Sequence, residues 1–417
     1  MKISGDGNIF SGDGLLLNSL KTWIETVLME NIFDYWFRNI IDEENNCFYG
    51  AIDKDENKIT EADKGLIFYT RILWAMSRGY GNYRDERMRK IADMAYDYLI
   101  EKFHDHEYGG FFWELDFRGN VKNSRKSIYG QAFSVYALSE YAKIFNRRDA
   151  LDYAVSVFNL IETYAKDEVN NGYIETFSRE WRMMDDIRLS EVDLNTEKSN
   201  NTHLHLMEAY TVLYEIKRDE ITEKALKNSI DVILNRVLDR DSLNFRLFFN
   251  REWKVECETI SCGHEIEAAW LIERALNVLA DEDYSRKNIH LVKEISHNCL
   301  SYVWRNPPHS ALNNEIDKYG NVDRKKIWWV QAEACVGFFN EYERNAEKEY
   351  LTIVSEIWSF IEMYIVDRKN GEWYHSAKEP GADEHPYKLD GWKSCYHNVR
   401  ACIELIERIE KCSGENK

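Results

Sequence analysis

The sequence contains little proline and glycine, no paired cysteine motif and no excess of positive charge. Four prolines and 20 glycines among 417 residues are few for an all-β protein of this size, so a helical fold is expected. A net charge of −19 without a basic stripe argues against nucleic acid or an anionic membrane as a partner. The eight cysteines are scattered without a CxxC pair, which indicates free thiols in a reducing compartment.

Long apolar runs and cofactor motifs are also missing. No window approaches the roughly 18 to 20 apolar residues of a membrane span, and the start, MKISGDGNIF, lacks the basic and apolar regions of a secretory signal. These features predict a cytoplasmic protein with no membrane partner. The sequence has no GxGxxG, Walker, HExxH or CxxC motif, so neither a nucleotide cofactor nor a metal is expected.

Apolar and aromatic residues are abundant, at 44% and 14% of the chain, and they supply a large core. They recur at spacings of three and four residues through most of the sequence, which is the pattern of amphipathic helices. About twelve helices are predicted from this pattern. Their ranges are 14–40, 62–81, 85–104, 127–146, 148–166, 199–217, 220–237, 261–280, 285–305, 326–345, 347–367 and 392–411.

Six loops that are aromatic, rich in Asn and Gly, or both separate pairs of predicted helices. They lie at 46–50, 108–113, 171–175, 243–248, 309–316 and 370–374, roughly every 60 to 70 residues. Each interval holds two helices, which leaves one helix at each end of the chain without a partner. If these two pair, the hairpins close into a ring. This predicts an all-α protein with a single domain over residues 1–417, an (α/α)6 barrel with a cavity at one end. An open α-solenoid is the alternative.

The stretch NTHLHLME at 201–208 holds the first candidate polar cluster. His203 and His205 are two residues apart, about 200° around a helix, so only one of them can face a cavity. A pair of metal ligands is therefore not expected here. Asn201, His205 and Glu208 share one face instead.

Other candidate groups follow the aromatic loops in the same way. They are His264 with Glu267, Trp329 with Glu333, Lys64 with Arg71, and the stretch 390–398 with Trp392 and His397. Taken singly, a helical histidine is more often a hydrogen-bonded structural residue, and a tryptophan more often belongs to the core. All of these groups, however, fall near the starts of alternate helices. We therefore expect them on one rim of the predicted barrel.

Histidines together with Arg and Glu suit proton transfer, because a histidine with a pKa near ~6.5 can both take and return a proton. A carbon-bound proton beside a carbonyl also requires stabilisation of the enediolate, for which Arg71 is the candidate. A Ser/His/Asp triad stays open, although no GxSxG motif is present. A glycoside hydrolase would need a carboxylic pair, with Asp193, Glu267 and Glu333 as candidates. A helical scaffold without enzymatic activity would not need such a cluster.

Seven segments carry a family resemblance. They are TRILW at 70–74, GGFFWELD at 109–116, YGQAFSVYALSEYA at 129–142, NTHLHLMEAYT at 201–211, GHEIEAAWLI at 263–272, WWVQAEACVGFF at 328–339 and YHNVRACIE at 396–404. In this order and spacing the chain resembles the N-acylglucosamine 2-epimerase superfamily, and within it the cellobiose 2-epimerase branch. The resemblance implies an (α/α)6 barrel and a sugar 2-epimerase that uses no metal or cofactor.

The resemblance also implies roles for individual residues. His264 and His397 would be the acid and base on opposite faces of the sugar, and His205 would assist ring opening. Arg71 would stabilise the enediolate. Glu267 and Glu333 would orient and tune the histidines. The expected substrate-binding residues are Tyr129, Asn201, Asp193, Trp329, Trp392 and Trp113.

The expected substrate is the reducing end of a β-1,4-linked disaccharide such as cellobiose. Mannobiose, mannose and N-acylglucosamine are alternative substrates, and aldose–ketose isomerisation is the alternative reaction. A monomer or weak homodimer is expected. The bulky stretch 66–70, the acidic stretch 183–200 and the sequence Lys393-Ser394-Cys395 depart from the typical cellobiose enzymes and leave the identity of the sugar open.

Overall fold

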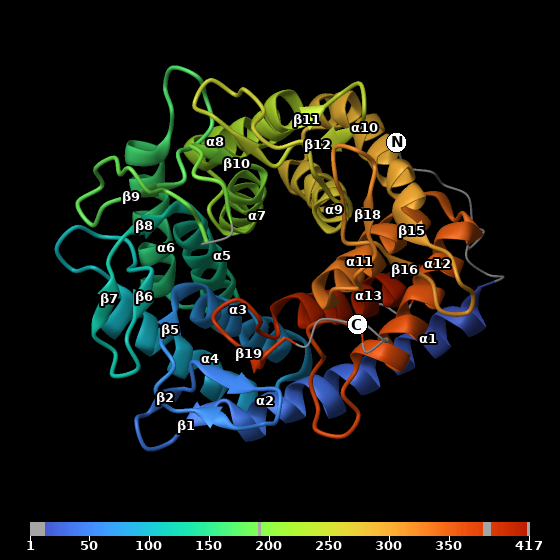
Figure 1. Ribbon diagram of the computed structural model, residues 1–417, viewed down its shortest axis with the longest axis horizontal. Coiled ribbons are helices and arrows are strands. Elements are labelled where there is room, and N and C mark those ends of the chain that lie inside the picture. The colour runs from blue at the N-terminus through green and yellow to red at the C-terminus, as the bar shows by residue number, and fades with distance from the viewer. Residues whose placement is uncertain (1–12, 191–192, 378–384, 415–417) are drawn as a thin grey trace.

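Six helices form the inner wall of a closed ring in the computed structural model, which describes residues 13–190, 193–377 and 385–414 (Figure 1). The first ten residues, on which the secretory-signal prediction rests, lie outside this description. Each inner helix packs against the next, and the last packs against the first. The inner helices are α3 (Leu66–Tyr83), α5 (Ile128–Phe145), α7 (Asn200–Ile216), α9 (Cys262–Leu279), α11 (Trp328–Asn345) and α13 (Tyr396–Ser413).

The outer helices cover the ring, and each packs against an inner helix. They are α1 (Gly14–Thr26), α4 (Glu86–Tyr98), α6 (Arg148–Leu160), α8 (Glu220–Val232), α10 (Glu282–Cys299) and α12 (Lys348–Phe360). Short helical segments continue them: η1 (Val27–Phe33), α2 (Asp34–Asn39), η2 (Leu99–Phe103), η3 (Ile161–Ala165), η4 (Ile233–Val237), η5 (Leu300–Tyr302) and η6 (Ile361–Ile365). The fold is therefore an (α/α)6 barrel, as the helix pattern predicted. None of the described helices is both long and apolar enough to cross a membrane.

The two terminal helices close the ring. Helix α1 packs against α13, and α13 packs against α3. The contact face of α1 carries Leu17, Leu20 and Ile24, which are spaced three and four residues apart and fully buried. The predicted pairing of the ends is confirmed, and the open solenoid is wrong.

Inner and outer helices differ in how much of their surface is buried. Helix α5 is buried without interruption from Ile128 to Ala142, whereas α4 buries only a stripe that includes Met88, Ile91 and Ala95. A polar side chain on an inner helix must therefore find a partner inside the protein or point into the central cavity. The ends of the inner helices are where such groups collect.

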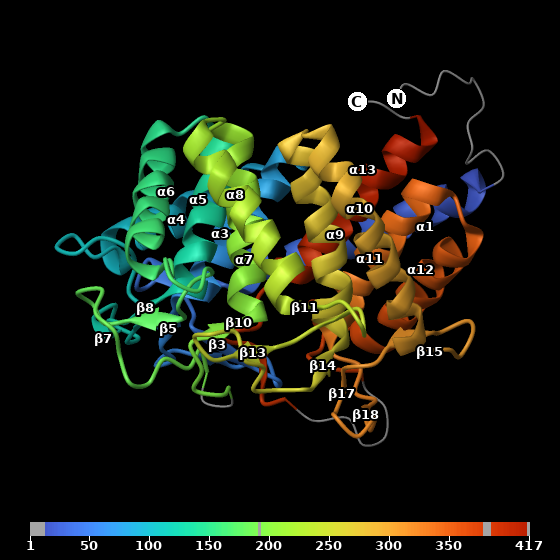
Figure 2. The same cartoon turned by 90° about the horizontal axis from the view of Figure 1, so that it is seen from above.

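Short strands gather at one end of the barrel, at the N-terminal ends of the inner helices (Figure 2). The strands are β1 (Ile41–Asp42), β2 (Cys47–Phe48), β3 (Ala51–Asp53), β4 (Lys58–Ile59), β5 (Lys64–Gly65), β6 (Glu114–Leu115), β7 (Val121–Asn123), β8 (Lys126–Ser127), β9 (Thr176–Phe177), β10 (Lys198–Ser199), β11 (Leu238–Asp239), β12 (Asn244–Phe245), β13 (Phe248–Phe249), β14 (Ile260–Ser261), β15 (Val303–Trp304), β16 (Ala311–Leu312), β17 (Glu315–Ile316), β18 (Val322–Asp323) and β19 (Tyr387–Leu389).

These strands correct one sequence expectation. Lys64 was expected to share a helical face with Arg71, but it lies in β5, before α3 begins. Its Nζ donates to the carbonyl oxygen of Phe48 at 2.8 Å. The predicted helix started four residues too early because β5 is too short to show strand alternation.

Buried lysine–aspartate pairs fasten the loops to the starts of the inner helices. The three pairs, called the loop–helix pairs below, are Lys126–Asp105 at 3.0 Å, Lys198–Asp167 at 3.0 Å and Lys388–Asp367 at 2.5 Å. Each aspartate follows an outer helix and also accepts backbone N–H groups of its own loop. The pairs thereby fix the rim from which the polar residues project.

Candidate active site

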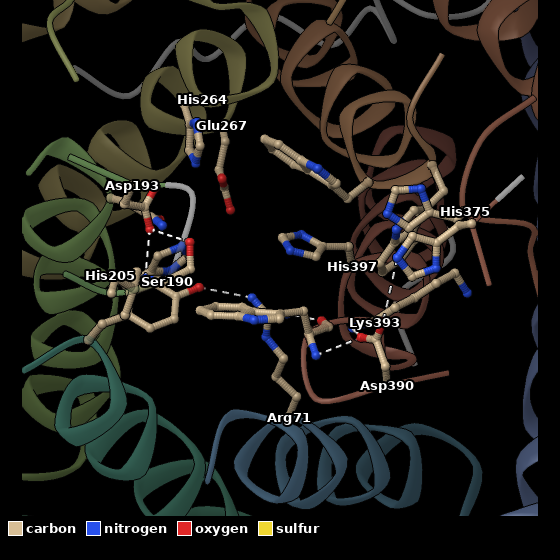
Figure 3. A pocket seen from close by; sticks show the side chains of 17 residues that line it. Arg71, Ser190, Asp193, His205, His264, Glu267, His375, Asp390, Lys393 and His397 are labelled. Carbon is tan, nitrogen blue, oxygen red and sulfur yellow. Dashed lines mark hydrogen bonds and ion pairs between the residues drawn. The ribbon is translucent and has the colours of Figure 1, made fainter. Parts of the chain in front are cut away.

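A cleft of about 640 Å³ opens at the strand-bearing end of the barrel (Figure 3). Many of the residues predicted for the site line it together. They are Arg71, Tyr129, Asp193, Asn201, His205, His264, Glu267, Trp329, Trp392 and His397. Because the inner helices all start at this end, side chains from their first turns converge although they are far apart in sequence.

His264 on α9 and His397 on α13 both face this cleft. The indole of Trp329 packs against both imidazoles, with ring centroids 4.9 Å from His264 and 5.5 Å from His397. Nδ1 of His264 bonds to Ser261 Oγ at 2.8 Å, and Nδ1 of His397 bonds to Glu333 Oε1 at 2.7 Å. The Nε2 atom of each ring remains as the nitrogen able to meet a substrate.

His205 is the third histidine of the cleft. Its Nδ1 lies 2.8 Å from Glu208 Oε2, and its ring meets Tyr129 edge-on at 5.2 Å. His203 points elsewhere, as the helical spacing predicted: its Nε2 accepts the backbone N–H of Tyr173 at 2.9 Å. The two histidines of this motif therefore have different environments and do not form a ligand pair.

Arg400 connects the carboxylates behind His205 and His397 with Glu267. It is fully buried on α13 and donates to Glu208, Glu267 and Glu333, the last at 2.7 Å. Its Nη1 also lies 2.5 Å from the Tyr396 hydroxyl. Sequence reasoning missed Arg400, although its position three residues after His397 on one helix was an available signal.

Arg400 carries one positive charge and contacts three carboxyl groups, so it cannot balance all three if each is ionised. Burial and the nearby Glu333 raise the pKa of Glu267 to about 7. Burial also opposes the ionised form of Glu208, but the charge of Arg400 and the bond from His205 outweigh it and hold that pKa at about 2. Glu208 is therefore the ionised member, and Glu267 is able to carry a proton near neutral pH.

Glu267, Glu333 and His397 have ligand atoms within 4.8 Å of one another, as a metal site would require. The guanidinium of Arg400 already donates to both carboxylates. It supplies at this point the positive charge that a cation would bring. Among the described residues, both carboxylates of this set are thus already hydrogen-bonded to Arg400.

Arg71 forms a fixed cationic wall of the cleft (Figure 3). Its Nη1 donates to the carbonyl of Trp392 at 2.6 Å and its Nη2 to the hydroxyl of Tyr129 at 3.0 Å. The guanidinium also stacks on the rings of Phe133 at 4.8 Å and Tyr396 at 5.2 Å. Its Nε has no protein partner among the described residues. Packing and bonds together hold the group in one orientation before any ligand binds.

Burial controls the charge of the two central histidines. It lowers the pKa of His264 to about 3, with a further contribution from His205. Burial and the positive charges of Arg71 and Arg400 lower the pKa of His397 well below its usual value. Both imidazoles are therefore neutral near pH 7 in the free protein, which is the form that accepts a proton.

The outer part of the cleft is aromatic and polar. Trp392 is 41% exposed there, and Ser190 Oγ donates to Asp193 Oδ2 at 2.7 Å. Trp113, predicted to bind substrate, lies outside the central cleft in an adjoining cavity of about 370 Å³, with its ring 5.9 Å from that of Trp392. Glu333 also lies outside the cleft wall, because it is fully buried behind His397.

The structure adds lining residues to those predicted for the site. They are Leu189, Ser190, Trp328, His375, His385, Asp390 and Lys393. Asp390 and Lys393 belong to the stretch 390–398 that the sequence had already singled out. The rings of His375 and His385 stack at 4.0 Å, and His385 Nε2 lies 3.6 Å from Asp390 Oδ2. Most of these residues come from irregular segments, where no helical period exists to predict which side chains point inward.

Comparisons with known proteins identify the family of this chain. The family model described as N-acylglucosamine 2-epimerase (GlcNAc 2-epimerase) matches residues 47–401. A cellobiose 2-epimerase of Bacteroides fragilis is 37% identical over 388 residues, which cover 93% of this chain and 98% of that protein. One of Dictyoglomus turgidum is 35% identical over 394 residues, covering 94% and 100%.

A solved structure of cellobiose 2-epimerase from Bacillus thermoamylovorans superimposes with a TM-score of 0.89 at 38% identity, covering 94% of this chain and 100% of that one. The residues matched by the family model, 47–401, include Arg71, His205, His264 and His397. The chain therefore belongs to the N-acylglucosamine 2-epimerase family, and it is a carbohydrate epimerase.

Proposed function

We propose that the protein is a cellobiose 2-epimerase, which interconverts the glucose and mannose configurations at C2 of the reducing end of a β-1,4-linked disaccharide. The observation that carries this proposal is the pair His264 and His397, two neutral imidazoles facing one cleft with Arg71 held beside them. Relatives named cellobiose 2-epimerase match over almost the whole chain at 35 to 37% identity.

The reaction starts with ring opening, in which the O1 proton is removed, the C1–O5 bond breaks and O5 gains a proton. His205 lies in the cleft with Glu208 behind it and suits this transfer. The resulting C1 carbonyl acidifies the proton on C2. One histidine removes that proton, and the electron pair of the C–H bond moves into a cis-enediolate.

The enediolate carries negative charge, which the guanidinium of Arg71 stabilises by hydrogen bonding. The second histidine, which takes up a proton on Nε2 before this step, delivers it to the opposite face of C2 and becomes neutral, and inversion results. Two bases avoid any reorientation of the planar intermediate. Glu333 orients His397 through the 2.7 Å bond to Nδ1, while Glu267 shares the guanidinium of Arg400 with Glu333.

The rest of the cleft suits the second sugar ring. Trp392 offers an exposed aromatic face, and Asp193 and Asn201 offer hydrogen-bonding groups at the same cleft. Aromatic faces with a few polar groups are the usual composition of small-ligand sites. We place the reducing ring between His264 and His397 and the other ring against Trp392.

Isomerisation to a ketose is the second candidate reaction, because the same enediolate gives a ketose if the proton returns to C1. A D-mannose isomerase of Marinomonas mediterranea matches 93% of this chain at 21% identity. Glycoside hydrolysis is not favoured. Glu267 and Glu333 are engaged by Arg400, and Asp193 accepts hydrogen bonds from the amide and hydroxyl of Ser190.

The deciding experiment incubates the protein separately with cellobiose, lactose, mannobiose, mannose and N-acetylglucosamine and separates the products by sugar chromatography. We expect cellobiose to yield glucosyl-mannose, and the same mixture to form from glucosyl-mannose. Ketose as the only product would assign the isomerase reaction instead. Release of monosaccharides would assign the hydrolase, and no change in any sugar would contradict an epimerase of these substrates.

We further propose that activity requires no metal, because Arg400 supplies the positive charge between the buried carboxylates. Turnover of cellobiose should be the same with and without EDTA. Loss of activity in EDTA, with recovery on adding a divalent ion, would contradict this. A cytoplasmic location accords with eight cysteines that are all free thiols.

A further inference from the structure

The three histidines that inner helices bring to the cleft, His205, His264 and His397, differ in the group that holds Nδ1. Glu208 holds His205 at 2.8 Å and Glu333 holds His397 at 2.7 Å, so both face a carboxylate. Nδ1 of His264 instead lies 2.8 Å from the hydroxyl of Ser261, a neutral group. His264 is therefore positioned in a different way from the other two.

Ser261 occupies the N-cap position of α9. An N-cap hydroxyl ordinarily accepts the backbone N–H of the second or third residue of the helix. Ser199, at the same position of α7, does so: its Oγ accepts the N–H of Thr202, three residues on, at 3.1 Å. Ser261 makes no such bond and contacts the side chain of His264, also three residues on. Its hydroxyl therefore hydrogen-bonds the imidazole of His264 and not the backbone of the helix.

The surroundings of Ser261 leave its own proton free to be donated. Ser261 and His264 both line a side chamber of about 150 Å³ next to the cleft. Glu315, the cross-strand partner of Ser261 in the β14–β17 pair, lines it too. Oγ1 of Thr196 and Oδ1 of Asn201 are buried here without a hydrogen-bond partner in the described part of the chain, so the chamber is polar enough to hold water. The hydroxyl can thus accept from His264 and donate into the chamber.

We propose that Ser261 is a positioning residue that holds His264 with the proton on Nδ1 and the lone pair of Nε2 directed into the cleft. This inference rests on the proposed function, in which His264 exchanges a proton with C2. A neutral imidazole carries one proton, so a bond donated from Nδ1 determines that Nε2 is the acceptor.

The same bond persists through the reaction. When Nε2 takes the C2 proton, the electron pair of the C–H bond enters the enediolate, and both nitrogens of His264 carry a hydrogen. Ser261 still accepts from Nδ1 in this imidazolium state. A hydroxyl does this without adding a negative charge, so His264 returns its proton more readily than a histidine paired with a carboxylate.

The test compares Ser261→Ala, Ser261→Thr and the control Ser127→Ala. Ser127 is the N-cap residue of α5, and its buried hydroxyl has no partner among the described residues, so its removal leaves every histidine contact intact. Turnover of cellobiose gives kcat and KM. The ¹⁵N shifts of histidine-labelled protein give the tautomer of His264, whose signals are assigned by their loss in His264→Gln.

Ser261→Ala should lower kcat by about tenfold, the scale of one lost hydrogen bond, with KM within about twofold of the wild type. Its His264 signals should move from the Nδ1–H tautomer toward the Nε2–H form. Ser261→Thr, which keeps the hydroxyl, should restore kcat and tautomer, and Ser127→Ala should match the wild type in both.

Several results would overturn the proposal. Unchanged kcat in Ser261→Ala, an Nε2–H tautomer of His264 in the wild type, or a Ser261→Thr variant as impaired as Ser261→Ala would each do so. Failure of the wild type to epimerise any sugar would contradict the proposed function instead. The ¹⁵N measurement would still decide whether Ser261 sets the tautomer.

Discussion

At the scale of single residues, the proposed proton transfer depends on His264 and His397, whose imidazoles both pack against the indole of Trp329. We expect His264→Ala and His397→Ala each to lower kcat for epimerisation by at least about 10²-fold. This is the smaller end of what a general acid or base contributes. The control is His290→Ala, which replaces an exposed histidine on α10 and should keep full turnover.

The isotope experiment belongs with these variants. In D₂O the wild-type product should carry deuterium at C2, because the proton is delivered by a histidine that exchanges with solvent between turnovers. Near-wild-type turnover of either alanine variant would remove that histidine from the mechanism. Product without deuterium at C2 would favour one shielded base that returns the same proton.

Arg400 is the residue whose loss should disturb the fold most. It is fully buried and compensates Glu208, Glu267 and Glu333. Arg400→Met should therefore lower the free energy of unfolding by about 3–5 kcal/mol, the usual cost of leaving a buried charge without its partner. Urea unfolding monitored by circular dichroism measures this loss.

Arg408→Met provides a comparison, since Arg408 forms its ion pairs with Glu343 and Glu404 near the other end of α13, where the groups are partly exposed. It should lose less stability than Arg400→Met. Equal losses in the two variants would show that the Arg400 cluster contributes no more than a peripheral ion pair.

At the scale of elements, the helices were predictable and the strands were not. The inner helices were predicted within a few residues, for example 261–280 against Cys262–Leu279 for α9, because each holds apolar residues at helical spacing over several turns. Strands of two or three residues, such as β14, are too short for any alternation. They form because the loops bring distant segments together.

The same distinction explains which parts of the site were predictable. His264 and His397 sit in the first turns of α9 and α13, so their place on the rim followed from the predicted helix starts. Arg71 lies in the second turn of α3, and the spacing that paired it with Lys64 was wrong because Lys64 precedes the helix. Ser190 and His375 come from irregular segments, and only the folded chain places them at the cleft. Trp113 lies in the segment before β6, where spacing gives no direction, and lines the adjoining cavity that also contains Trp392.

The contact between α9 and α11 allows a test of element packing. A Cβ added to Gly337 on α11 would lie 2.4 Å from Cγ1 of Ile266 and 3.0 Å from its carbonyl oxygen on α9. Gly337→Ala should therefore push the helices apart and cost about 1–3 kcal/mol of stability. Because α9 carries His264, kcat should fall as well.

Gly14→Ala is the matched control, since a Cβ there meets nothing within 4 Å at the start of α1. It should be neutral or slightly stabilising, because alanine favours helix more than glycine. Thermal unfolding of both variants measures the difference. A Gly337→Ala protein as stable as Gly14→Ala would contradict the close approach of the two helices.

At the scale of the whole molecule, the loop–helix pairs make the fold sensitive to acid. Burial alone would raise the pKa of Asp367, but the ammonium of Lys388 outweighs it and holds the pKa at about 2. Hydrogen bonds from Lys126 and Arg179 likewise keep the pKa of Asp105 below its usual value despite its burial. An aspartate in the unfolded chain titrates near ~3.9.

Because the folded-state pKa values are depressed, this stabilisation is complete above about pH 4 and is lost as the pH falls toward 2. For Asp367 alone the loss amounts to about 2 kcal/mol. Urea unfolding at pH 6 and pH 3 should show the decrease, and Asp367→Asn should show a smaller decrease from a lower starting stability. A stability independent of pH between 6 and 3 would contradict the prediction.

The closure of the ring by α1 and α13 has a consequence for how the protein is made. Synthesis delivers the chain from the N-terminus. The carboxylates of Glu208, Glu267 and Glu333 are therefore made long before Arg400, the cation that all three contact. Until the last inner helix leaves the ribosome, these three carboxyl groups lack the guanidinium that all of them contact. The final helix thus brings in one step the proposed second base, the shared cation and the seam of the ring, so completion of the fold and of the proposed catalytic centre is the same late event.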